Sequence, residues 1–152
     1  MKKLFFITLI LLTFSFIFAK EIKVANYPNS ITVLHSNIQE TVIDYKIGEF
    51  NLTPIEINGE EYNKISVKDG HYSYIKGNPE LPVITKSIII PNDAKVQIEV
   101  LQSDFTEFNL KVIPSKGKIL RSQNPEDIPY EFSNTYTLNE FYPSQLGRIK
   151  FV

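Results

Sequence analysis

The stretch Gly77-Asn78-Pro79-Glu80-Leu81-Pro82 stands near the middle of the chain and restricts how its neighbours can fold. Each proline fixes its own φ at about −65° and disfavours a helical conformation for the residue before it. The stretch is therefore predicted to be extended. Because proline has no N–H to donate, such a segment can join a β-sheet only at an edge or where no ladder hydrogen bond is needed.

A β-hairpin is predicted on the N-terminal side of this stretch. Residues 51–57 and 61–67 flank the pair Asn58-Gly59, and an Asn-Gly pair favours the positive φ values of a type I′ turn. The apolar residues of the second segment change parity after Tyr62. This slip of one residue predicts a β-bulge near Asn63.

The clearest strand signal lies on the C-terminal side. Residues 96–100 and 108–112 alternate apolar and polar side chains, and residues 102–106 join them. These segments predict an antiparallel hairpin with one buried face. The apolar run Ser87-Ile88-Ile89-Ile90-Pro91 predicts a further strand that ends at Pro91.

The rest of the chain also favours short strands. Residues 41–47 combine helical spacing with strand-like alternation, and their β-branched content favours a strand. Residues 122–129 contain too many turn-forming residues for regular structure. The other predicted strands are residues 21–24, 31–35 and 130–136. Short strands separated by Pro and Gly predict an all-β fold, an antiparallel β-sandwich or jelly-roll-like domain.

Composition limits the functional classes. The chain has 152 residues, of which 43% are hydrophobic and 22% charged, and its net charge is −1. These values are typical of a folded domain. The chain has no run of basic residues, so nucleic acid is not suggested as a partner. The sequence contains no cysteine. A disulfide, a thiolate metal site and a catalytic thiol are therefore impossible within this chain.

The first residues have the pattern of a secretory signal peptide. Lys2 and Lys3 precede an apolar run at residues 4–19, which is shorter than a membrane-spanning helix requires. We expect cleavage between Ala19 and Lys20, which would leave residues 20–152 as one exported domain with no membrane segment. The last residues have the pattern of a strand that is just beginning, so we expect a longer precursor that is truncated here.

Few residues are candidates for chemistry. His35 and His71 lie 36 residues apart, and no G-x-S-x-G motif or zinc-ligand spacing accompanies them. A Ser/His site is therefore a minor alternative, and no catalytic residue, metal ligand or cofactor is predicted. The aromatic residues either fill the core or form a sugar- or protein-binding face. They include Tyr72, Tyr74, Tyr130, Tyr136, Phe141 and Tyr142.

The order of turns, prolines and apolar strands resembles the N-terminal propeptide of gingipain-type cysteine peptidases. The likeness covers about residues 55–143. The residues that carry it are Asn58, Gly59, Gly77, Pro79, Leu81, Pro82, Pro91 and Pro114. This resemblance implies an exported precursor in which a β-rich prodomain precedes a caspase-like domain with a Cys–His dyad. Because this chain has no cysteine, the peptidase activity does not transfer to it.

The resemblance implies that this prodomain keeps the peptidase latent and assists its folding. In such precursors a basic side chain of the prodomain blocks the specificity pocket of the peptidase domain, which would be the partner here, in cis or in trans. The pocket-blocking candidates are Arg121 first, then Lys118 and Lys116. Arg148 and Lys150 are candidate processing points. The alternative function is a non-catalytic secreted β-sandwich that binds a glycan or protein.

Overall fold

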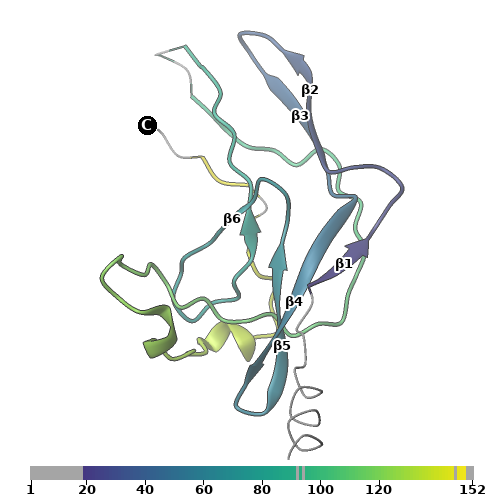
Figure 1. The fold of residues 1–152 in the computed structure, drawn as a ribbon. Coiled ribbons are helices and arrows are strands. Elements are labelled where there is room, and N and C mark those ends of the chain that lie inside the picture. Colours follow the sequence, from purple (N-terminus) through teal and green to yellow (C-terminus); the bar gives the residue numbers. More distant parts are fainter. Residues whose placement is uncertain (1–18, 92, 94, 146, 150–152) are drawn as a thin grey trace, which may run out of the picture.

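The computed structural model describes residues 19–149 except 92, 94 and 146. The described chain consists of short β-strands, two 3-10 helices and long irregular connections (Figure 1). The strand pairs within its sheets are antiparallel, which confirms the predicted all-β class. The predicted signal peptide lies outside the described residues apart from Ala19, and Lys20 is the first residue of β1. No helix of the described part is long and apolar enough to cross a membrane.

The largest sheet has the strand order β1-β4-β5, formed by β1 (Lys20–Lys23), β4 (Glu49–Ile57) and β5 (Glu60–Ser66). Asn58 and Gly59 connect β4 to β5 with φ values of 54° and 82°, as the predicted type I′ turn requires. The β4–β5 register runs without a shift from Ile57↔Glu60 to Asn51↔Ser66. The predicted bulge near Asn63 is therefore wrong. In this continuous register Tyr62 pairs with Ile55 and Ile65 pairs with Leu52, so the apolar residues of β5 lie on both faces without a bulge.

A second hairpin projects from this sheet (Figure 1). It joins β2 (Ser30–Ser36) to β3 (Thr41–Lys46), which confirms the strands predicted at residues 31–35 and 41–47. Its register shifts between Val33 and His35, which marks a bulge or irregularity in this hairpin. The proline-rich stretch supplies the last paired strand. Its β7 (Pro82–Val83) pairs with β6 (His71–Tyr72), so the stretch joins a sheet only in a two-stranded ladder.

The hairpin predicted from residues 96–100 and 108–112 is wrong. Residues 95–111 form no strand, and Ile98 and Val100 are 46% and 52% exposed. The end of this segment pairs elsewhere. The Asn63 N–H donates to the Lys111 carbonyl at 2.7 Å, and the Ile113 N–H donates to the Asn63 carbonyl at 3.1 Å. The edge of β5 thus pairs with the chain at Val112 in a parallel bridge.

Two other strand predictions are also wrong. The run 87–91 is unpaired, and Ile89 is fully exposed. Residues 130–136 contain the 3-10 helix η3 (Asn134–Tyr136) in place of a strand, because the Ser133 side chain caps its first turn. A second 3-10 helix, η2 (Pro125–Asp127), lies within the predicted loop 122–129.

The buried core is small. Phe50, Leu52 and Ile57 of β4 are buried together with Ile113, and Phe108 packs edge-on against Phe50 at 5.2 Å between ring centroids. Ile113, Pro114 and Ser115 are the most deeply buried side chains. The packing centre therefore lies where residues 113–115 meet the proline-rich stretch.

Candidate functional site

Three distant segments meet at the proline-rich stretch, and we call them together the hub: residues 77–80, 113–115 and 133–135. The Gly77 N–H donates to the Ser115 carbonyl at 2.8 Å, and the Ser115 N–H donates to the Asn78 carbonyl at 2.8 Å. The Ser133 N–H donates to the Gly77 carbonyl at 2.9 Å. The backbone of Gly77-Asn78 is thus hydrogen-bonded to both other segments.

The Asn78 side chain completes the hub. Its Oδ1 accepts hydrogen bonds from the hydroxyls of Ser133 at 2.6 Å and Thr135 at 3.2 Å. Its Nδ2 donates to the Tyr142 hydroxyl at 3.3 Å. A half-buried amide with its hydrogen bonds satisfied in this way fixes one arrangement of its neighbours.

Gly77 is required at the hub for two reasons. Its φ is +82°, a conformation that residues with a side chain rarely adopt. A Cβ atom at this position would also lie 3.2 Å from the Ser133 backbone nitrogen. The family-pattern residues Gly77 and Pro79 therefore have a structural role. Pro79 and Pro114 face each other in an antiparallel bridge.

The loop at residues 116–130 begins and ends at the hub, and a lysine clamps its base. The Lys116 Nζ donates to the Pro125 carbonyl at 2.7 Å and lies 4.3 Å from the centroid of the Tyr130 ring. Asn124 caps η2 by accepting a hydrogen bond from the Glu126 N–H at 3.2 Å. The two sides of the loop are therefore held together by side chains where no strand pairing is present.

A β-turn at residues 120–123 forms the tip of this loop. The Gln123 N–H donates to the Leu120 carbonyl at 3.0 Å, and the Leu120 N–H donates to the Gln123 Oε1 at 2.9 Å. These two bonds close the turn from both directions and leave Arg121 at its first corner. Arg121 is exposed, and its guanidinium has no hydrogen bond or ion pair with any described residue.

The structure separates the three pocket-blocking candidates. The Lys116 ammonium is engaged in the clamp and cannot reach a partner without opening the loop. Lys118 is exposed but precedes the turn. Arg121 alone occupies the corner of the tip. Of the candidate processing points, Arg148 is exposed on an irregular segment, and Lys150 lies outside the described residues.

One half-buried carboxylate lies at the hub. Burial raises the pKa of Glu80 above its ordinary value, and the nearby charges of Lys64 and Lys116 lower it without cancelling that effect. The Lys64 Nζ is 3.9 Å from Oε1 of Glu80, whose side chain is 12% exposed. The Glu80 N–H also donates to the Ile113 carbonyl at 2.9 Å.

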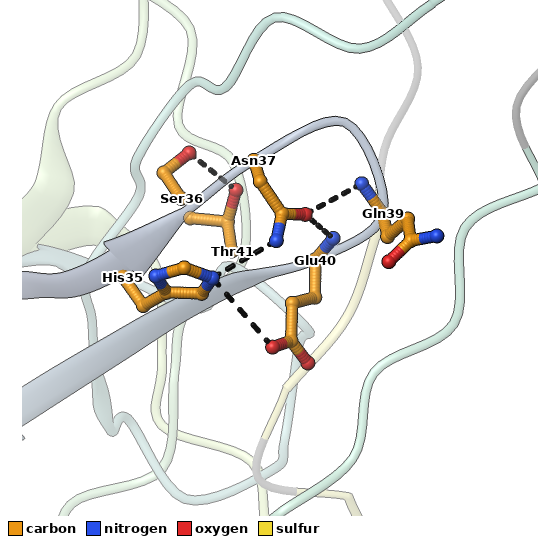
Figure 2. A network of polar contacts seen from close by, with 6 residues as sticks. All are labelled: His35, Ser36, Asn37, Gln39, Glu40 and Thr41. Carbon is orange, nitrogen blue, oxygen red and sulfur yellow. Dashed lines mark hydrogen bonds and ion pairs between the residues drawn. The ribbon is translucent and has the colours of Figure 1, made fainter.

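Neither histidine forms a catalytic dyad. Figure 2 shows that the His35 ring lies at the β2–β3 turn beside Asn37 and Glu40, with its Nε2 2.9 Å from the Asn37 Nδ2. The neighbouring Ser36 hydroxyl is hydrogen-bonded to Thr41 at 3.0 Å and not to the imidazole. The described residues contain no group of His, Asp and Glu that could hold a metal ion.

The second histidine lies in a strand. His71 is the first residue of β6. Its Nε2 is 3.3 Å from the Thr85 hydroxyl at an exposed position. Because neither atom is held in a pocket, this contact gives no support to a hydrolytic site.

Tyr72 and Tyr74, two of the aromatic residues considered for a binding face, do not form a shared platform. Lys64 covers the Tyr72 ring at 4.5 Å from its centroid, whereas Tyr74 is 56% exposed. The aromatic residues gather elsewhere, around a hollow of about 490 Å³ that we call the aromatic hollow. Its walls are formed by Tyr62, Leu81, Leu110, Phe132, Tyr136 and Tyr142. Tyr136 and Tyr142 were among the aromatic residues considered for a binding face, but the sequence did not indicate that Tyr62 and Phe132 would meet them.

The chain is similar in sequence to one part of a longer protein. Gingipain R1 of Porphyromonas gingivalis is 27% identical over 134 residues, which cover 87% of this chain and 13% of that relative. The chain thus spans only a small part of the length of this relative.

Two solved structures share the fold. One is a complex of the pro- and mature domains of RgpB from Porphyromonas gingivalis, with a TM-score of 0.71 and 23% identity over 76% of this chain and 60% of that chain. The other concerns the zymogenic latency of gingipain K from the same organism, with a TM-score of 0.65 and 22% identity over 84% of this chain and 74% of that chain. The family Propeptide_C25 matches residues 20–150, and the chain belongs to that family.

Proposed function

We propose that this chain is the exported prodomain of a gingipain-type cysteine peptidase precursor, and that it keeps the peptidase domain latent by placing Arg121 in its specificity pocket. The observation that carries the proposal is the position of Arg121 at the corner of a closed turn, on a loop that is clamped at its base. Membership of the Propeptide_C25 family supports the prodomain role.

The energetics favour Arg121 over the other two cations. Its guanidinium has no partner among the described residues, so binding to a carboxylate breaks no ion pair there. The planar guanidinium can form two parallel hydrogen bonds to one carboxylate. A desolvated charge pair of this kind contributes several kcal/mol to binding in favourable cases. Because the turn is already closed, less conformational entropy is lost when the tip is bound.

The proposed function also includes the export of the precursor and the later release of the prodomain. Cleavage between Ala19 and Lys20 would make Lys20 both the new N-terminus and the first residue of β1. The prodomain would then assist the folding of the peptidase domain and cover it. Arg148 is an accessible point at which the two could later be separated, and Lys150 is the second candidate.

Inhibition assays with residues 20–152 test the proposal. The target is the gingipain-type peptidase domain encoded in the same precursor. We expect nanomolar to micromolar inhibition, weakened at least tenfold by Arg121→Ala, which corresponds to about 1.4 kcal/mol. Arg121→Lys should retain part of the effect because it keeps the charge but loses the planar fork.

Lys118→Ala is the matched control and should change the inhibition constant less than twofold. Full inhibition by the Arg121→Ala variant would show that another residue blocks the pocket. A precursor without a peptidase domain, or no inhibition at all, would reject the proposed function.

A further inference from the structure

The aromatic hollow lies beside the hub and is open to solvent. Phe132 forms one wall, is 41% exposed, and stacks against Tyr62 and Tyr136 with centroid distances of 5.3 Å and 5.0 Å. The volume of the hollow, about 490 Å³, falls within the range of about 300–1,000 Å³ that is typical of ligand pockets.

The polar groups on the rim of the aromatic hollow are already engaged. The Tyr62 hydroxyl donates to the Glu60 Oε2 at 3.3 Å. The Lys111 Nζ donates to the same oxygen at 2.8 Å, and this bond with the ion pair that it forms lowers the pKa of the Glu60 carboxyl. The charges of Lys111 and Glu60 on the rim therefore compensate each other.

Two other tyrosine hydroxyls that line the hollow also form hydrogen bonds. The Tyr136 hydroxyl donates to the Val112 carbonyl at 3.0 Å, and the Tyr142 hydroxyl accepts a hydrogen bond from Asn78 at 3.3 Å. Burial raises the pKa of Tyr136 far above its ordinary value, so this ring stays neutral. The surface that the hollow presents to a ligand therefore consists of aromatic ring faces and aliphatic groups.

We propose that the aromatic hollow binds an apolar side chain, most favourably an aromatic one, that projects from the peptidase domain. This inference rests on the proposed function and adds a second anchor to it. A glycan fits the hollow poorly, because sugar hydroxyls need free polar groups that fix their orientation. An apolar ring needs only the contacts that the walls provide.

Two observations favour the peptidase domain as the occupant. Phe132 and Tyr136 follow the 116–130 loop directly, and Figure 1 shows that loop and η3 on the same side of the molecule. A partner that holds Arg121 is thus brought close to the hollow. This chain also covers only 13% of the length of Gingipain R1, so most of such a precursor lies outside it. A single pocket gives modest affinity, but a tethered partner reaches a high effective concentration.

Binding of residues 20–152 to the purified peptidase domain, measured by isothermal titration calorimetry, tests this inference. Phe132→Ser should raise the dissociation constant about tenfold or more, because it removes a wall of the pocket that the anchor fills and such anchors dominate interfaces. The heat-capacity change of binding should become less negative, because less apolar surface is buried. Phe132→Leu should have a smaller effect, since it keeps apolar contact.

The controls separate this inference from the proposed function. Phe105 is 80% exposed and lies outside the hollow, so Phe105→Ser should leave the dissociation constant unchanged. Inhibition that Phe132→Ser retains should still depend on Arg121, which would show that the variant is folded. Unchanged affinity for Phe132→Ser, with inhibition still dependent on Arg121, would overturn only the second anchor. Equal losses of affinity for Phe132→Ser and Phe105→Ser would also overturn the second anchor. Glycan binding that Phe132→Ser abolishes, with unchanged affinity for the peptidase domain, would overturn it as well.

Discussion

The 116–130 loop and the 84–110 segment are both irregular, but they differ in the hydrogen bonds that hold them. Side chains and turns fix the loop, through Lys116, Gln123 and Asn124. The described residues of the 84–110 segment form no backbone hydrogen bond to one another or to the rest of the described chain. The difference teaches that hydrogen bonds made by polar side chains, and not apolar alternation, determine which irregular region of this domain is fixed.

The largest expected effect on this comparison comes from Gly77→Ala. The new Cβ would be held at a positive φ and within 3.2 Å of a backbone atom, so we expect a loss of at least about 2 kcal/mol of unfolding free energy. Gly59→Ala is the matched control, because Gly59 has the same φ of +82° with nothing within 4 Å. It should cost about 1 kcal/mol. Urea unfolding of both variants provides the measurement, and equal losses would show that the hub has no special role.

Asn78→Ala is expected to have the next largest effect. It removes the acceptor of two hydroxyls and the donor to a third, and leaving such half-buried groups unsatisfied costs about 1–3 kcal/mol. Val100→Ser in the 84–110 segment changes a 52% exposed side chain and should stay within about 0.5 kcal/mol. Thermal unfolding compares the two. If Val100→Ser were the more destabilising change, the alternating segment would be packed against the core.

Sequence reasoning found the local features and missed the distant pairings. The Asn58-Gly59 turn and the extended proline-rich stretch follow from φ preferences of single residues, so both were predictable. Residues 96–100 and 108–112 alternate as strands do, but alternation does not identify the partner strand. The edge of β5 at Asn63 pairs with residues 111–113 instead.

The candidate site divides in the same way. Arg121 was nominated from a resemblance and its residue type, whereas its turn depends on the side chain of Gln123. The hub depends on Asn78, Ser115 and Ser133, small polar residues that have no periodicity to detect.

Lys116→Met tests whether the loop is anchored by its clamp. The change removes one hydrogen bond to the Pro125 carbonyl and one cation–π contact with Tyr130, together about 1 kcal/mol. We expect faster hydrogen exchange at the Gln123 amide and a few-fold weaker inhibition of the peptidase. Lys118→Met should change neither. If both variants behaved alike, the clamp would not hold the loop.

The smallest expected effect is the pH response of the hub through Glu80. Burial raises the pKa of this carboxyl in the folded chain above its ordinary value of 4.5. The folded state thus binds this proton more tightly than the unfolded chain does, and stability falls as pH rises from 4.5 through the folded pKa. Glu80→Gln keeps the neutral form at every pH. Its melting temperature should exceed that of the wild type at pH 7, and the difference should shrink as the pH falls below 4.5.

Glu131→Gln is the control for the pH response, because Glu131 pairs with Lys76 at 2.7 Å with both side chains more than half exposed. Exposed pairs contribute little, so its melting curve should follow that of the wild type. A lower melting temperature for Glu80→Gln at pH 7 would mean that Lys64 and Lys116 stabilise the charge by more than burial opposes it. The hub would then be held by charge pairing as well as by the neutral hydrogen bonds of Asn78, and its anchoring would weaken in high salt.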